Sequence, residues 1–322
     1  MKKHFTELSS ELSKFKSVTI LNAPYSFQNV GDLAILRGTF KILSENSIHV
    51  DYVASLHSFN ERYFKRKTTE GAILFAGGGW PNDQYPKMTE FANRILHSYK
   101  ESKIVFLPFS CTGLSQERLV EFIALCEKHR NVSLFARDTV SYSAILNLLH
   151  AYGEEFNTKV YLTPDMAQFI DAKKKNSNSG KKKDFRNLLS IVARTDSESI
   201  FTLEKIPNES QDWYSSINRL SRLFAVTFYT VPWISKASFM FLTKIQIAIG
   251  SQGILNARFI VTDRLHVAIL GTMAGSQVIL LKNSDCKALN YFSTWPVDGC
   301  NLQTAETFDE AISRVLRREV EG

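Results

Sequence analysis

The chain has 322 residues, of which 44% are hydrophobic, and it carries a formal net charge of +7. This apolar content excludes a globally disordered chain, and the length suits two domains of ordinary size. The basic excess is compatible with an anionic small substrate, an anionic membrane surface or nucleic acid, and it does not choose between them.

The N-terminal segment places Phe5, Leu8, Leu12 and Phe15 at helical spacing, which predicts a short amphipathic helix. It lacks the continuous apolar run of a secretory signal, and no uncharged apolar run in the chain reaches the ~18 residues of a membrane span. The four cysteines form no C-x-x-C pair and no histidine cluster completes a metal site. We therefore expect a cytoplasmic protein with reduced thiols and no bound metal.

The first half of the chain alternates short apolar runs with helical patterns. Strands that alternate with helices are typical of a parallel sheet covered on both faces. The predicted strands span residues 17–22, 48–54, 71–76, 103–107, 132–136 and 160–162, and the predicted helices span residues 33–43, 91–98, 117–128 and 140–149.

Residues 171–184 read DAKKKNSNSGKKKD and are almost free of apolar residues, which predicts a solvated linker. Contact with lipid headgroups or nucleic acid is the alternative, and the absence of aromatic residues among the lysines disfavours nucleic acid. A second α/β pattern follows, with predicted strands at residues 187–193, 223–230, 259–262 and 278–281 and predicted helices at residues 213–223, 237–249, 266–274 and 306–318.

These patterns predict an α/β fold with two Rossmann-like domains. The first domain is expected at residues 1–172 and the second at residues 186–322, with residues 173–185 as the lysine-rich linker or loop. Because ligands of open parallel sheets bind beyond the carboxyl ends of the strands, we expect the active site in the cleft between the domains.

Two glycine-containing segments follow predicted strands. Asn29-Val30-Gly31-Asp32 opens a helix, where backbone N–H groups favour an anion, and a plain helix cap is the alternative. Gly77-Gly78-Gly79 lets backbone amides converge on an oxyanion, or makes a tight turn. Trp80 either stacks on a sugar ring or fills the core. Neither segment is a G-x-G-x-x-G fingerprint, so no nicotinamide cofactor is indicated.

Arginines also follow predicted strands, at Arg137, Arg194 and Arg264. Such a guanidinium can hold a phosphate or carboxylate bidentately, and a salt bridge to a neighbouring acid is the alternative for the first two. Beside Arg264, Asp263 can orient a neighbour and His266 can move a proton near neutral pH. Three arginines at three strand ends predict a receptor for a small, multiply charged anion.

Seven motifs, in this order, resemble those of the polysaccharide pyruvyltransferase family, and the bacterial exopolysaccharide subgroup is most similar. They are Asn29-Val30-Gly31-Asp32, Gly77-Gly78-Gly79, Leu107-Pro108-Phe109-Ser110, Arg137-Asp138 with Ser141, Pro164-Asp165-Met166-Ala167, Arg194-Thr195-Asp196 and Asp263-Arg264-Leu265-His266. The resemblance runs from about residue 19 to about residue 300 and implies two Rossmann-like domains in a GT-B-like arrangement. It also implies phosphoenolpyruvate as donor, no cofactor, and as acceptor a sugar of a surface polysaccharide or its lipid-linked precursor.

The implied reaction forms a cyclic pyruvate ketal and releases phosphate. His266 is the candidate general acid, Arg264 stabilises charge, Asp263 orients the site, and Asp32 positions an acceptor hydroxyl or acts as base. The expected donor-binding residues are Arg137, Arg194, Gly77, Gly78, Gly79, Asn29 and Gly31, and the expected acceptor-binding residues are Trp80, Asn82, Asp83, Asn283 and Trp295.

Two other functions fit the same sequence features. One is a GT-B-like glycosyltransferase that uses a nucleotide sugar, and the other is a non-catalytic sugar- or anion-binding protein of the same fold. Residues 213–241 combine aromatic and basic side chains, which suits peripheral contact with an anionic inner membrane leaflet, and a buried helix face is the alternative. The sequence indicates no oligomeric state.

Overall fold

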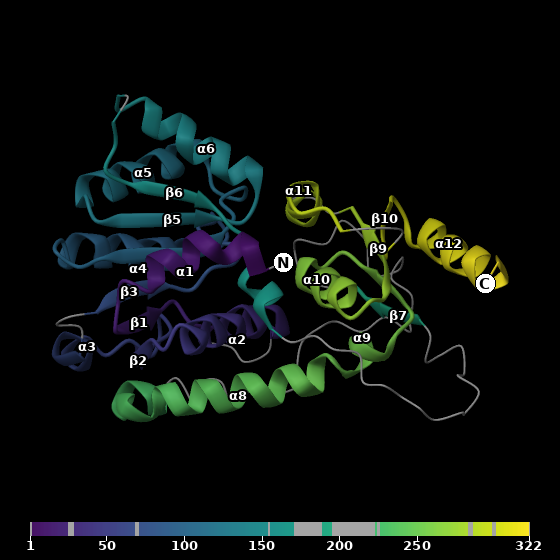
Figure 1. Ribbon diagram of the computed structural model, residues 1–322, viewed down its shortest axis with the longest axis horizontal. Coiled ribbons are helices and arrows are strands. Elements are labelled where there is room, and N and C mark those ends of the chain that lie inside the picture. The colour runs from purple at the N-terminus through teal and green to yellow at the C-terminus, as the bar shows by residue number, and fades with distance from the viewer. Residues whose placement is uncertain are drawn as a thin grey trace. The chain divides into compact units, whose positions relative to one another are not determined.

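The computed structural model describes residues 2–24, 29–67, 71–153, 155–170, 189–194, 223, 226–282, 286–297 and 301–321 (Figure 1). The chain divides into two compact units. The first contains Met1–Phe27, Asp32–Ile170 and Ser216–Ile245, and the second contains Gln28–Gly31, Asp171–Ser215 and Gln246–Gly322. Each unit thus draws on segments from both sides of the predicted linker at residues 173–185, which itself lies outside the described residues.

The first unit is built on a six-stranded parallel sheet with the order β2-β1-β3-β4-β5-β6. The central strands β3, β4 and β5 are buried at every position, as expected for strands with helices on both faces. The strands are β1 (Ser17–Leu21), β2 (His49–Val53), β3 (Ala72–Phe75), β4 (Ile104–Phe109), β5 (Val132–Ala136) and β6 (Lys159–Leu162). The helices are η1 (Lys2–Phe5), α1 (Thr6–Leu12), α2 (Val30–Glu45), α3 (Glu61–Lys67), α4 (Pro86–Ser98), α5 (Gln116–His129), α6 (Thr139–His150) and η2 (Met166–Phe169).

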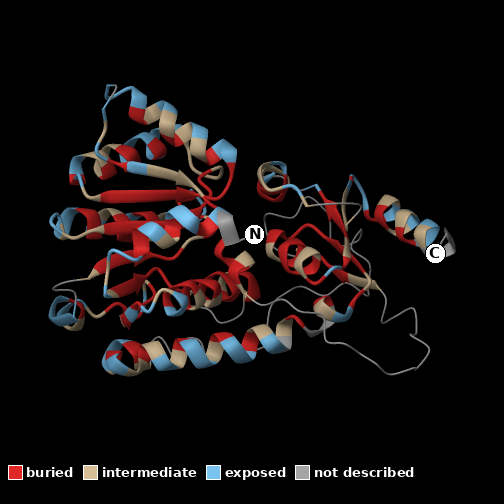
Figure 2. Cartoon of the chain, in the orientation of Figure 1, coloured by how far each residue is buried: buried red, intermediate tan, exposed pale blue. Residues whose placement is uncertain are grey.

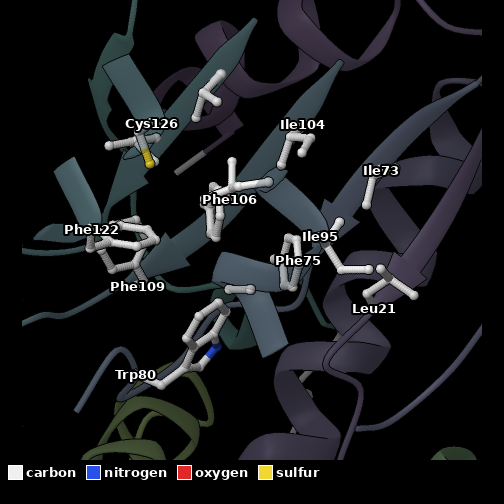
Figure 3. Close-up of a cluster of buried hydrophobic side chains, with 14 of the residues drawn as sticks. Leu21, Ile73, Phe75, Trp80, Ile95, Ile104, Phe106, Phe109, Phe122 and Cys126 are labelled. Carbon is white, nitrogen blue, oxygen red and sulfur yellow. The ribbon is translucent and has the colours of Figure 1, made fainter. Parts of the chain in front are cut away.

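Aromatic side chains dominate the core on one side of this sheet (Figure 3). The rings of Phe75 and Phe106, on neighbouring strands, stack with their centroids 4.8 Å apart. Phe122 of α5 meets Phe106 edge-on at 5.2 Å, and Trp80 packs against both strand residues. Such ring pairs add stabilisation beyond the apolar area that they bury.

The N-terminal helix is fixed by one buried carboxylate as well as by its apolar face. Phe5, Leu8 and Leu12 are buried, as the amphipathic pattern predicts. Glu11 forms an ion pair with Lys103 at 2.9 Å and accepts a hydrogen bond from the Ser133 hydroxyl at 2.8 Å. Burial works to raise the pKa of Glu11, but hydrogen bonds from Lys14, Lys103 and Ser133 outweigh it and lower the pKa to about 2.

The second unit contains a four-stranded parallel sheet with the order β10-β9-β8-β7. Its strands are β7 (Leu189–Val192), β8 (Phe259–Thr262), β9 (Gln277–Leu281) and β10 (Leu302–Ala305). Its helices are α9 (Gln252–Asn256), α10 (Leu265–Met273), α11 (Lys287–Thr294) and α12 (Phe308–Glu321). A further helix, α8 (Ser235–Gly250), begins in the first unit and ends in the second.

Two parallel sheets confirm the predicted α/β fold class. The strand predicted at residues 223–230 is wrong, because residues 226–230 are helical. Residues 213–222, predicted as a helix, lie outside the described residues. The GT-B-like arrangement and the cleft between the domains stay predictions. Within the described part of the chain, no helix is both long and apolar enough to cross a membrane.

Candidate functional site

The segment Thr262–His266 forms a tight connection between β8 and α10. β8 is buried throughout, and its last residue, Thr262, donates a hydrogen bond from its hydroxyl to the Val192 carbonyl at 2.6 Å. The same hydroxyl oxygen accepts a hydrogen bond from the Arg264 backbone N–H at 3.0 Å. Because α10 begins at Leu265, the side chain of His266 lies in its first turn.

Asp263 is a buried carboxyl that links the ends of two neighbouring strands. Its side chain is 1% exposed, and Oδ1 accepts a hydrogen bond from the Arg194 backbone N–H, just beyond β7, at 2.9 Å. Burial raises the pKa of Asp263 to about 6, although that hydrogen bond and the charge of Arg264 both act to lower it. Raised carboxyl pKa values of this kind are frequent at functional sites.

His266 lies against the glycine of a second predicted segment. A Cβ atom at Gly31 would stand 2.4 Å from His266 Nδ1 and 2.9 Å from its Cγ. The Gly31 backbone N–H donates to the Asn29 side-chain oxygen at 3.0 Å, which turns the chain into α2. Asn29, Gly31, Arg194 and His266 therefore belong to one compact unit, although they are far apart in the sequence.

The glycine segment after β3 is explained largely by backbone packing in the first unit. A Cβ at Gly77 would stand 2.1 Å from the Pro108 carbonyl oxygen, and Gly78 has a φ of +123°. The Gly78 N–H donates to the Pro108 carbonyl at 3.0 Å, and its carbonyl accepts from the Ser110 N–H at 2.9 Å. These contacts favour the tight-turn alternative for Gly77 and Gly78, and a donor contact at Gly79 stays a prediction.

Arg137 has a protein partner in the first unit. Its guanidinium forms an ion pair with Asp165 at 2.8 Å, and the two side chains are 3% and 0% exposed. Asp138 caps α6 by accepting a hydrogen bond from the Ser141 N–H at 2.8 Å. This geometry is the salt-bridge alternative for Arg137, and donor binding by Arg137 stays a prediction.

The family of the chain follows from its similarity to known sequences. A sequence model of the polysaccharide pyruvyl transferase family matches residues 29–285. The chain belongs to this family. "Pyruvyl transferase 1" of Schizosaccharomyces pombe is 25% identical over 335 residues, which cover 97% of this chain and 78% of that protein. A Bacillus subtilis protein named "Putative pyruvyl transferase EpsO" is 29% identical over 294 residues, or 87% of this chain and 86% of that protein.

A solved structure supports the fold assignment. An uncharacterized protein from Klebsiella pneumoniae superposes with a TM-score of 0.63 at 19% identity, covering 95% of this chain and 99% of that one. At this identity the likeness shows the fold alone.

The acceptor-binding residues predicted for this pyruvyl transferase family member lie in different environments. Trp80 is buried, packs against Phe75 and Phe106, and donates its indole N–H to the Ala76 carbonyl at 2.7 Å, which favours the core-filling alternative. Asn82 is also buried, and its side-chain oxygen accepts from the Gln84 N–H. Asp83 is exposed and lies 3.4 Å from Arg118.

The remaining predicted residues are less constrained. Trp295 is half-buried at the end of α11, and Asp32 is half-buried in the first turn of α2. Asn283 lies outside the described residues. Among the residues that the structure describes, no three His, Cys, Asp or Glu side chains gather as they would around a metal ion.

One polar residue was missed by sequence reasoning. Asn22 follows β1 with a φ of 56°, and its side chain is 4% exposed. Among the residues that the structure describes, neither amide atom has a hydrogen-bond partner. Burying an unpaired amide is costly, so each such group calls for an explanation such as a ligand. Asn22 follows β1 and the glycine segment follows β3, the two neighbouring strands where the strand order reverses, which is where open α/β sheets bind ligands. In the sequence, the only signal that points to Asn22 is its position at the end of a predicted strand.

Proposed function

We propose that this protein transfers the pyruvyl group of phosphoenolpyruvate to a sugar of a surface polysaccharide or its lipid-linked precursor, forming a pyruvate ketal. The main observation that supports this proposal is the Asp263–His266 connection, which places a buried acid, an arginine and an imidazole at the carboxyl end of β8. Membership of the polysaccharide pyruvyl transferase family supports the same reaction.

In this proposal, Arg194 and Arg264 of the second unit bind the donor. Arg194 and Arg264 follow the paired strands β7 and β8, where Val192 lies opposite Thr262. Phosphoenolpyruvate carries a carboxylate beside a phosphate, so guanidinium groups at neighbouring strand ends suit its charge. Asp263 holds the backbone of Arg194 and so fixes the spacing of the two strand ends.

The reaction needs one proton donor and no redox step. Two sugar hydroxyl oxygens each form a bond to C2 of the enol, and the bond from C2 to the phosphate oxygen breaks. The methylene carbon takes up one proton and becomes a methyl group, the two hydroxyls lose one proton each, and phosphate leaves carrying the second. His266 delivers the proton to the methylene carbon, and the arginines stabilise the charge that develops on phosphate.

Acceptor binding is assigned to other residues. Asp32 positions or deprotonates an acceptor hydroxyl, because a half-buried carboxylate in the first turn of α2 can accept a proton. Asn22 is a better candidate for hydrogen bonding to the sugar than Trp80, whose ring is enclosed by the aromatic core.

Ligand-dependent thermal stability tests the donor. A ligand that binds only the folded state stabilises it by RT ln(1 + [L]/Kd), so the unfolding temperature rises with the logarithm of the ligand concentration once the site is saturated. Phosphoenolpyruvate should stabilise the protein, and UDP- or GDP-sugars should not. Arg264→Gln should abolish the effect, whereas Arg258→Gln, at the opposite end of β8, should retain it. Stabilisation by a nucleotide sugar and not by phosphoenolpyruvate would establish the glycosyltransferase alternative instead.

A further inference from the structure

The helix α8 has the reverse of the usual polarity in the part that belongs to the first unit. Its buried face there carries Ser235, Phe239 and Thr243, two of which are polar. Its exposed face carries Met240, Phe241 and Ile245, and Figure 2 shows exposed residues along the length of the helix. A surface helix of a soluble protein ordinarily buries its apolar stripe and exposes its polar one.

The chain just before α8 extends this exposed apolar character. Residues 226–230 are helical and pack against α8 through Phe228 and Phe239, whose ring centroids lie 5.1 Å apart. Of the twelve large exposed hydrophobic residues in the described chain, seven fall between residues 223 and 245. We call these seven the apolar surface: Leu223, Val226, Tyr229, Trp233, Met240, Phe241 and Ile245.

Trp233 is 71% exposed and Phe241 is 63% exposed, so two large aromatic side chains project into solvent. Single exposed apolar residues need no explanation, but a concentration of them marks an interaction site. Tyr and Trp are typical of surfaces that meet the headgroup region of a bilayer, because their rings have both apolar and polar parts.

The charged residues of the segment that carries the apolar surface are all basic. The sequence contains no Asp or Glu from Trp213 to Thr262, while Lys236 and Lys244 lie within α8. Lys244 is exposed one turn after Met240 and Phe241, so its long apolar stem can lie along the same face while its ammonium group reaches outward. Lysines close to the membrane surface are attracted to anionic lipid headgroups, and salt screens this attraction.

We propose that the apolar surface binds the headgroup region of an anionic lipid bilayer, with α8 lying in the plane of the interface. The described helices do not span a bilayer, and an interfacial helix does not need to, since it buries only its apolar face to a depth of about 5–10 Å. Aromatic and aliphatic side chains enter the acyl boundary, and Lys236 and Lys244 bind lipid phosphates.

A second copy of the chain is the other occupant to consider. In a two-fold interface, the same surface packs on itself. The lysines of the two copies would then face each other in a segment that supplies no carboxylate to neutralise them. Charge complementarity therefore favours the anionic bilayer.

Flotation of the full-length protein with vesicles tests this proposal. Vesicles of equimolar phosphatidylglycerol and phosphatidylcholine should carry the protein at low salt, and vesicles of phosphatidylcholine alone should carry much less. The double variant Trp233→Ser with Phe241→Ser should reduce binding at least about tenfold, because it removes the two most exposed aromatic rings. Lys236→Glu with Lys244→Glu should reduce it similarly and remove its salt dependence.

The matched control is Val140→Ser with Tyr152→Ser, which removes two comparably exposed apolar residues elsewhere in the first unit and should bind as the unaltered protein does. Light scattering reports the oligomeric state of the same samples. No flotation of the unaltered protein with anionic vesicles would overturn the proposal, as would equal losses in the control. A dimer that dissociates in the Trp233 and Phe241 variant would assign the surface to a second copy. Flotation requires neither donor nor acceptor, so its outcome is independent of the proposed reaction.

Discussion

Gly31 and His266 are in direct contact: a methyl group at position 31 would stand 2.4 Å from the imidazole Nδ1. The Asn29 side-chain oxygen accepts a hydrogen bond from the Gly31 backbone N–H. The Asp263 side chain accepts one from the Arg194 backbone N–H, just beyond β7. The position of the His266 imidazole thus depends on Gly31, which has no side chain and lies more than 200 positions earlier in the sequence.

Gly31→Ala should displace the imidazole while leaving the fold intact. A displacement of about 1 Å in a catalytic group can cost on the order of 100-fold in rate, so we expect phosphate release to fall by roughly 10- to 100-fold. The measurement is kcat for phosphate release from phosphoenolpyruvate with an acceptor sugar, with circular dichroism to verify folding.

A double-mutant cycle supplies the control for this effect. Once His266→Ala has removed the ring, adding Gly31→Ala should cost little more, because the contact no longer exists. Fully additive losses would show that Gly31 acts through something other than His266.

Asp263 makes stability depend on pH in a defined direction. Its pKa is about 6 in the folded protein, against an ordinary value of 3.8, so the folded state binds more protons between these values. The contribution of Asp263 to stability is therefore fully present below about pH 4 and is lost as the pH rises through about 6.

Asp263→Asn should remove that pH dependence. The asparagine oxygen can still accept the Arg194 N–H, so the free energy of unfolding above pH 6 should rise, by up to about 3 kcal/mol at 1.36 kcal/mol per pKa unit. Denaturant unfolding from pH 4 to pH 8 measures the difference between the two proteins. A variant that is less stable than the unaltered protein at pH 7.5 would contradict a carboxylate destabilised by burial.

Asp165→Asn tests whether Arg137 is structural. The substitution leaves a buried guanidinium without its 2.8 Å partner, which typically costs about 3–5 kcal/mol. Glu61→Gln, which breaks the exposed pair with Lys65, should leave the unfolding midpoint almost unchanged. An unfolding midpoint that Asp165→Asn leaves unchanged, together with a weaker affinity for phosphoenolpyruvate, would contradict the structural role.

Asn22→Gly separates a binding role from a packing role. Glycine adopts the observed φ of 56° readily and removes a buried amide whose atoms lack partners in the described part of the chain, so stability should be unchanged or higher. If the amide binds the acceptor, KM for the acceptor should rise at least about tenfold, on the scale of one lost hydrogen bond to a ligand. An unchanged KM would leave Asn22 without a role in binding.

Much of the fold could be predicted from the sequence because strands buried on both faces are continuous apolar runs. β3 and β4 are such runs, β8 is apolar up to its last residue, and the structure places strands there. Residues 223–230 are also apolar and rich in β-branched and aromatic residues, yet residues 226–230 are helical, because Phe228 packs against Phe239 of α8. Periodicity alone does not distinguish a short buried strand from a helix.

Site residues could be predicted from the sequence where a charged group follows a strand. They were harder to predict where contacts with distant residues determine the environment of a side chain. Asp263 and His266 stand out in the sequence as titratable groups at a strand end. Nothing in the sequence shows that Arg137 would pair with Asp165, or that Trp80 would be enclosed by phenylalanines. Both depend on contacts between residues that are distant in the chain or on different elements.

The most direct test of the proposed reaction is acceptor-dependent phosphate release from phosphoenolpyruvate, measured for the unaltered protein and for His266→Ala across a panel of lipid-linked and nitrophenyl sugars. We expect at least one sugar to support release together with a pyruvate ketal detected by mass spectrometry. We also expect His266→Ala to remain folded and to lose the rate by at least about 100-fold. A ketal formed at an equal rate by His266→Ala would contradict the role of the imidazole, and phosphate release with no ketal on any sugar would contradict the reaction itself.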